Sequence, residues 1–175
     1  KDLDDIIDNQ MKGCEDAIKM IDELPGIGKR SAEIIVSEIG VDMTRFPSAS
    51  HICSWSGLSP GNNESAGKRK SGKTNKGNKH LKSILIQCAK AAAKDKKSFF
   101  YAQYQRLVVR RGANRASVAV AHSMLIAIYH MLKDKVPFKD LSSDYYTKFN
   151  TQSKANYYIK KLQELGVPVP VSLAV

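Results

Sequence analysis

The sequence predicts an all-α protein. Apolar residues recur at steps of three and four in several segments, as at Leu81, Leu85 and Cys88, and this is the spacing of one helix face. No stretch shows the strict apolar and polar alternation that a half-buried strand requires. Proline and glycine mark the ends of the helical segments, and 175 residues suffice for one ordinary core or two small ones.

The first predicted helix spans Asp2 to Glu23. Its apolar stripe consists of Ile7, Met11, Cys14, Ile18 and Ile21. This spacing fits a coiled-coil seam over about three heptads, so residues 1–23 are expected to end a coiled-coil linker helix that makes a homo-oligomer. A helix packed on its own domain is the alternative. Because the chain opens with Lys1 rather than Met, we expect it to be a piece of a longer protein.

A tight turn, Leu24-Pro25-Gly26-Ile27-Gly28, is expected to separate this helix from a second one over Lys29 to Ile39. Pro25 lacks the N–H that a continuing helix needs. The pattern is that of a helix-hairpin-helix, whose exposed amides and positive helix terminus suit a phosphate. The residues expected to contact a nucleic-acid backbone are Gly26, Gly28, Lys29 and Arg30. A simple helical turn is the alternative.

More helices are expected in a domain over residues 24–140 and in a C-terminal helix and loose tail over residues 141–175. Periodicity and end signals place them at Thr44–Ser56, Gly77–Lys94, Ser98–Arg111, a long helix capped by Asn114 and ended by Pro137, and Lys154–Leu165. In the first of these, Phe46, Ile52 and Trp55 are predicted to be core residues. Stacking of Trp55 on a nucleic-acid base is the alternative.

Residues 57–80 differ from the helical segments in composition. Ser65 is followed by a run of cations, with no acidic residue from Ala66 to Lys82. Too few apolar residues are present to offset the entropy of ordering this segment, so a loop that becomes ordered on a polyanion is predicted. The cations expected to bind nucleic acid are Lys68, Arg69, Lys70, Lys73, Lys76 and Lys79.

The net charge of +11 indicates an anionic partner, with nucleic acid as the first candidate. The charge is unevenly spread, because residues 1–24 hold eight of the 17 acidic residues but three of the 28 Lys and Arg residues. A second basic cluster, expected to follow the same nucleic-acid strand as the first, consists of Arg110, Arg111 and Arg115.

The composition argues against a secreted, zinc-binding or membrane protein. Cys14, Cys53 and Cys88 are odd in number and contain no C-x-x-C pair, so neither a disulfide framework nor a structural zinc site is expected. The four histidines lack metal-binding spacing. Without a signal peptide or a run long enough to cross a bilayer, we expect a cytoplasmic protein with no membrane contact.

Six motifs in a fixed order carry a resemblance to a known family. They are Leu24-Pro25-Gly26-Ile27-Gly28 with Ala32, Arg45-Phe46, Gly57-Leu58-Ser59-Pro60, Ser65-Ala66-Gly67-Lys68 with Gly72-Lys73, Gly77-Asn78-Lys79-His80-Leu81-Lys82, and Ala119-Val120-Ala121-His122. Through them, Met20 to Phe138 resembles the C-terminal domain of the serine-dependent IS110-type insertion-sequence transposases, relatives of the Piv-type DNA invertases. Two motifs depart from the family pattern: Ser-Ala-Gly replaces Ser-Gly-Gly or Ser-Ser-Gly, and Ala121-His122-Ser123 replaces a frequent Arg-Lys pair.

The resemblance implies a DNA transposase or recombinase in which Ser65 forms a covalent phosphoserine link with DNA. It implies a RuvC-like N-terminal domain, missing from this chain, whose four acidic residues bind a divalent metal, expected to be Mg²⁺. The chain alone would then need no cofactor, bind nucleic acid and cleave nothing. A structured guide RNA that pairs with target and donor DNA is also implied.

Two other functions stay open. A non-catalytic helix-hairpin-helix module would use the basic loop only to hold DNA, and an RNA-binding domain would scaffold a ribonucleoprotein. Steep salt dependence is expected of all three functions, so it does not separate them. The serines near the basic run that rival Ser65 are Ser59, Ser71 and Ser83.

Overall fold

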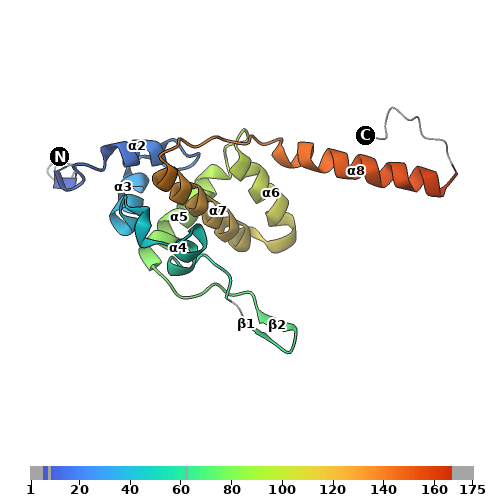
Figure 1. Ribbon diagram of the computed structural model, residues 1–175, viewed down its shortest axis with the longest axis horizontal. Helices are drawn as coiled ribbons and strands as arrows, with labels where there is room; N and C mark the ends of the chain where they lie inside the picture. Colours follow the sequence, from blue (N-terminus) through green and yellow to red (C-terminus); the bar gives the residue numbers. More distant parts are fainter. Residues whose placement is uncertain (1–5, 8, 62, 167–175) are drawn as a thin grey trace.

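The computed structural model describes residues 6–7, 9–61 and 63–166, without the side chains of residues 63–64, 68–70, 147, 149–150 and 152. Its helices are α2 (Glu15–Asp22), α3 (Lys29–Ile39), the 3-10 helix η1 (Met43–Arg45), α4 (Ala49–Trp55), α5 (Lys79–Ala92), α6 (Phe99–Arg111), α7 (Ala113–Asp134) and α8 (Tyr145–Glu164). The all-α class is confirmed, although the described chain also contains a short antiparallel hairpin of β1 (Asn63–Ser65) and β2 (Lys68–Ser71). Figure 1 shows α2 to α7 gathered in one body, from which the hairpin and α8 project in different directions.

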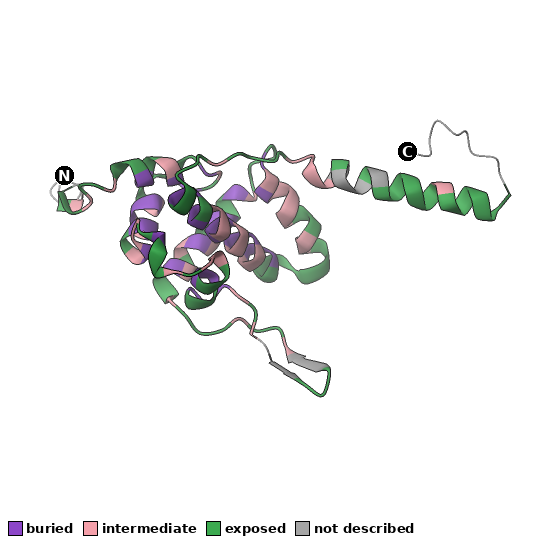
Figure 2. Ribbon diagram, viewed as in Figure 1, coloured by how far each residue is buried: buried purple, intermediate pink, exposed green. Residues whose placement is uncertain are grey.

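The long helix α7 is the centre of the body. It packs against α2, α4, α5, α6 and η1, because its buried face is formed largely by Val120, Met124, Leu125, Ile128 and Tyr129. The Tyr129 hydroxyl donates a hydrogen bond to the Phe46 carbonyl oxygen at 3.1 Å, so this large buried side chain keeps a partner for its polar atom. Figure 2 shows the buried residues concentrated in this body, whereas most of α8 is exposed.

Two of the described α-helices begin with a side-chain cap. Asn78 accepts a hydrogen bond from the Leu81 N–H at 3.0 Å, and Ser98 accepts one from the Tyr101 N–H at 3.1 Å. The predicted cap at Asn114 is wrong, because this residue lies inside α7 and no side chain caps that helix. Since α6 ends at Arg111 and α7 begins two residues later, the corner between them leaves no turn in which a cap would sit.

The turn between α2 and α3 packs against the end of α5. Gly26 has a φ of +86°, and a Cβ there would lie 2.4 Å from the Ala92 amide nitrogen and 2.5 Å from the Cys88 carbonyl oxygen. Gly28, which precedes α3, has open space around its missing Cβ. Gly26 is therefore required by its backbone conformation and by packing, whether or not a ligand is present.

The predicted continuous helix over Asp2 to Glu23 is wrong in the described residues. The chain turns at residues 11–13, and α2 begins only at Glu15. Ile18 and Ile21 of the predicted seam are buried in the core of the same chain, where α2 packs on α3 and α7. This part of the stripe therefore follows the alternative of a helix packed on its own domain, and a coiled coil over residues 1–23 stays a prediction.

The helix α8 begins at Tyr145, earlier than the predicted Lys154, and is fastened to α6 at its first turn. The Phe99 ring centroid lies 5.3 Å from that of Tyr145 and 5.5 Å from that of Tyr146. The Arg106 guanidinium lies 4.8 Å from the Tyr146 ring centroid, as in a cation–π contact. The predicted tail after Gly166 lies outside the described residues.

By length and composition, α7 is long and apolar enough to cross a membrane, with a mean hydropathy of 1.3, although the sequence predicted no such run. However, 56% of this apolar stretch is buried inside the protein. The hydrophobicity of α7 is accounted for by its place in the core of the body.

We expect Gly26→Ala to lower the free energy of unfolding by about 3 kcal/mol or more, since the new Cβ meets backbone atoms that cannot move aside. The matched control is Gly28→Ala, which should change it by less than about 0.5 kcal/mol. Urea denaturation followed by circular dichroism measures both. Equal destabilisation by the two substitutions would contradict this account of the turn.

Candidate nucleic-acid interface and serine arm

Residues 57–77, here called the serine arm, leave the body between α4 and α5 and carry the hairpin at their far end (Figure 1). Ser65 pairs with Lys68 across the hairpin, and the two residues between them are Ala66 and Gly67. Their φ angles of +51° and +73° are those of a type I′ turn, which matches the twist of the flanking strands. The tip of the predicted loop is therefore a hairpin with a tight turn, and ordering of the loop on a polyanion stays a prediction.

Ser65 is exposed at the last paired position before this turn. Ala66 adopts a left-handed backbone that costs a residue with a Cβ about 1 kcal/mol. This left-handed residue thus places mild strain directly beside the candidate nucleophile. Of the predicted phosphate-binding residues, Lys68, Arg69 and Lys70 form β2, and their side chains lie outside the described part of the structure.

The two ends of the serine arm, residues 57–61 and 73–77, run antiparallel and are here called its root. The Gly61 N–H donates to the Lys73 carbonyl oxygen at 2.8 Å, and Pro60 pairs with Thr74. The backbones come closest at Gly57 and Gly77, because a Cβ on Gly77 would lie 2.3 Å from the Gly57 nitrogen. The root is therefore closed by direct backbone contact, which leaves no room for a side chain at Gly77.

The ammonium group of Lys82 joins the two ends of the root. Its Nζ donates to the Gly57 carbonyl oxygen at 2.9 Å and to the Thr74 hydroxyl at 2.7 Å. By sequence alone, Lys82 is one more cation of the basic run, and nothing in the sequence distinguishes it. The structure gives it another role, because its charge is partly buried under the root while Lys73, Lys76 and Lys79 are exposed.

Asn78 fastens the outgoing end of the root to the body. Besides capping α5, it donates from its side chain to Glu38 of α3 at 2.6 Å and from its backbone to the Trp55 carbonyl oxygen at 3.2 Å. One short residue thus ties together the end of α4, the start of α5 and the last turn of α3. Sequence reasoning used Asn78 only as part of a family motif.

The imidazole of His122 lies under the incoming end of the root. It hydrogen-bonds the Leu58 backbone, and its Nδ1 is buried without a recorded partner. Burial lowers the pKa of His122 below its usual range, and the hydrogen bond to Leu58 opposes this only in part. A neutral histidine therefore lies against the Leu58 backbone at the incoming end of the root.

The residues predicted to contact a nucleic-acid backbone at the start of α3 lie close to an acidic side chain. Gly28, Lys29 and Arg30 are exposed, and no side chain caps the helix. Yet the buried Glu33 carboxylate lies 3.7 Å from the Lys29 ammonium and 3.1 Å from an Arg30 guanidinium nitrogen. Glu33 would therefore compete with a phosphate for these two cations.

The second predicted basic cluster stands apart from the arm. Arg110 and Arg111 end α6, and Arg115 lies in the first turn of α7, all exposed at the corner between these helices. The serine arm instead emerges between α4 and α5. The described structure thus places these three arginines on helices other than the two that flank the arm.

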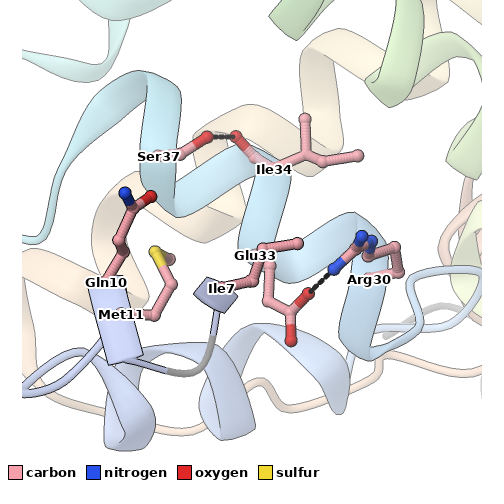
Figure 3. Close-up of a pocket in the computed structure, with 7 residues that line it drawn as sticks. All are labelled: Ile7, Gln10, Met11, Arg30, Glu33, Ile34 and Ser37. Carbon is pink, nitrogen blue, oxygen red and sulfur yellow. Dashed lines mark hydrogen bonds and ion pairs between the residues drawn. The ribbon is translucent and has the colours of Figure 1, made fainter. Parts of the chain in front are cut away.

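The described residues contain no group of three or more His, Cys, Asp or Glu side chains placed to hold a metal ion. The Mg²⁺ site that the resemblance implies belongs to a domain outside this chain, so these residues do not test it. Figure 3 shows a pocket between the N-terminal segment and α3, lined by Ile7 and Met11 on one side and by the Arg30–Glu33 ion pair on the other. None of the residues that line this pocket belongs to the arm.

Fold and site together define a basic helical domain that presents a hydroxyl on a fastened arm to a polyanionic partner. The sequence matches the Transposase IS116/IS110/IS902 family over residues 18–105, just over half of the chain, and the chain belongs to this family. DNA is accordingly its partner. The matched segment runs from α2 into α6 and includes the entire serine arm. No curated protein matches the sequence significantly.

We expect Lys82→Met to loosen the root of the serine arm, because it removes both hydrogen bonds of the ammonium group and keeps most of the apolar stem. Amide exchange at Gly61 and Asn75, which donate across the root, should accelerate by at least about tenfold. Lys79→Met removes an exposed charge from the same helix and should leave this exchange unchanged. Parent-like protection in Lys82→Met would contradict the role assigned to this residue.

Acid should destabilise the fold through His122. Since its pKa is lowered in the folded state, the unfolded chain binds the proton more readily between this lowered value and the usual value of about 6.5. Stability is therefore complete above this window and falls as the pH falls through it. His122→Gln keeps a side-chain N–H donor without a basic nitrogen, so its free energy of unfolding, measured in urea, should fall less between pH 7.5 and pH 5. An identical fall in parent and variant would refute this assignment.

Proposed function

We propose that this chain is the serine-bearing domain of a DNA transposase, in which the Ser65 hydroxyl attacks a DNA phosphodiester. The observation that supports this most directly is the position of Ser65: it is exposed at the tip of an arm whose root is fastened to the body by Lys82 and Asn78. A hydroxyl held in this way can reach a phosphorus atom on the surface of a duplex without the body entering a groove.

The proposed reaction is a transesterification. The Ser65 oxygen forms a bond to phosphorus, the bond from phosphorus to one sugar oxygen breaks, and that oxygen takes up a proton while the serine loses one. A DNA hydroxyl later attacks the phosphoserine and releases Ser65. The exposed ammonium groups of Lys73 and Lys76 on the outgoing side of the arm would neutralise phosphate oxygens during both steps.

The start of α3 is proposed as a second contact with the DNA backbone. The amides that follow Gly28, together with Lys29 and Arg30, would bind a phosphate in the manner of a helix-hairpin-helix. Such a contact reads no sequence. Its strength depends on whether the phosphate displaces Glu33 from its two cations.

Other parts of the proposal rest on the family rather than on described residues. A divalent metal would be held by a RuvC-like domain elsewhere in the protein, so this chain alone would bind DNA and not cleave it. A guide RNA would follow the corner formed by Arg110, Arg111 and Arg115, and residues 1–23 would support a homo-oligomer. The reaction would take place in the cytoplasm of the cell that carries the element.

A non-catalytic DNA-binding module is the second candidate. It is favoured by the exposed cations of the arm, which can bind phosphates without any reaction taking place. In this case the hydroxyl of Ser65 would have no special role, and the arm would act only through its charge. The two candidates therefore differ in what they require of one oxygen atom.

We expect Ser65→Ala in the complete transposase to reduce DNA strand joining by at least about 1,000-fold while changing DNA affinity by less than about twofold. Ser71→Ala alters a second serine of the same arm and should retain joining. Trapping of a covalent protein–DNA adduct on a nicked substrate, mapped by peptide mass, should locate the bond at residue 65. Normal strand joining by Ser65→Ala would contradict the role of Ser65 as nucleophile. An adduct at another residue would assign the nucleophile to that residue.

A further inference from the structure

Trp55 is not a core residue, although its apolar surroundings in the sequence predict burial. Its side chain is 43% exposed at the end of α4. The ring is nevertheless supported, because it packs on Phe46 with centroids 5.5 Å apart and planes tilted by 57°. Phe46 in turn packs against the core, and its carbonyl oxygen accepts the hydrogen bond of Tyr129. Trp55 therefore presents an apolar ring on a firm base.

This exposed residue adjoins the root of the serine arm. Its carbonyl oxygen accepts the Asn78 N–H and lies 2.5 Å from where a Cβ of Gly77 would stand. Lys76 on the arm and Lys79 at the start of α5 are exposed immediately on either side of this contact, and the first turn of α5 contains no acidic residue. The Glu38 carboxylate at this edge accepts a hydrogen bond from Asn78.

An exposed aromatic residue whose backbone contacts a segment flanked by exposed cations suits a partner that combines flat apolar groups with negative charge. A paired base within a duplex has both of its faces covered by its neighbours, whereas an unpaired base leaves a face free for stacking. A purely apolar partner would gain nothing from the neighbouring Lys76 and Lys79. Because the family acts on DNA, the partner of this chemistry is a DNA strand whose bases are locally unpaired.

We propose that Trp55 is a stacking platform for an unpaired DNA base, next to phosphates bound by Lys76 and Lys79. The inference deepens the proposed DNA-binding function of the arm and does not require Ser65 to be the nucleophile. The root of the arm would then bind unpaired DNA more tightly than duplex DNA. A duplex contacts only Lys76 and Lys79, whereas a locally unpaired strand also stacks a base on the Trp55 ring.

The experiment uses Trp55 as its own probe, because it is the single tryptophan of the chain. Titration with single-stranded oligothymidine should quench its fluorescence, as base stacking does, whereas an abasic strand of equal length and inorganic polyphosphate should bind without comparable quenching. Equal quenching by the strands with and without bases would overturn the proposal, since charge alone would then account for the signal. The titration is repeated in Ser65→Ala, where quenching should persist. The test of Trp55 stacking is therefore independent of whether Ser65 is the nucleophile.

Affinity measurements supply the second criterion. Trp55→Ala should weaken binding of oligothymidine about tenfold and binding of the abasic strand less than about twofold, whereas Trp55→Phe should retain most of the preference for bases. Lys76→Ala should weaken both strands alike. Unchanged affinity of Trp55→Ala for oligothymidine, with its unfolding midpoint preserved, would overturn the proposal. Tighter binding of oligouridine than of oligothymidine by the parent protein would also overturn it, because the stacking platform would then belong to RNA.

Discussion

The close approach of Gly57 and Gly77 is the constraint on which the presentation of Ser65 depends. The segment between them is too polar to bury itself, so nothing along its length except backbone pairing can fix its direction. At the root, contact between two glycine backbones brings the strands together, and the ammonium group of Lys82 bridges them. The hairpin inherits its orientation from this point, and α4, α5 and α7 serve to hold the point in place.

The cations of this chain have distinct surroundings. Lys82 is turned inward as a structural donor, and Lys29 and Arg30 face a buried carboxylate on their own helix. Lys73, Lys76 and Lys79 are exposed along the outgoing side of the arm. A high net charge therefore does not by itself identify a binding surface, because a positive group already opposed by Glu33 has less to offer a phosphate.

Backbone strain lies at the tip of the arm, and the hydrogen bonds that support the arm lie at its root. At the tip, the left-handed backbone of Ala66 is a cost that the two-residue turn imposes beside Ser65. At the root, Asn78, Lys82 and His122 supply hydrogen bonds that fasten the chain to three different helices. This distribution suits an arm that must keep its direction while its tip adapts to a partner.

The sequence alone determined the helical class, the boundaries of α3 and the buried face of α5 that contains Leu81, Leu85 and Cys88, because a period near 3.6 and Gly or Pro end signals are local properties. It also singled out Ser65 and its cations through local composition and a family resemblance. It did not show the hairpin, the break before α2 or the exposure of Trp55, because burial depends on which other segments are near. Only the tertiary structure decided that Lys82 clamps the root and that Glu33 faces Lys29 and Arg30, since identical lysines differ only in the groups that surround them.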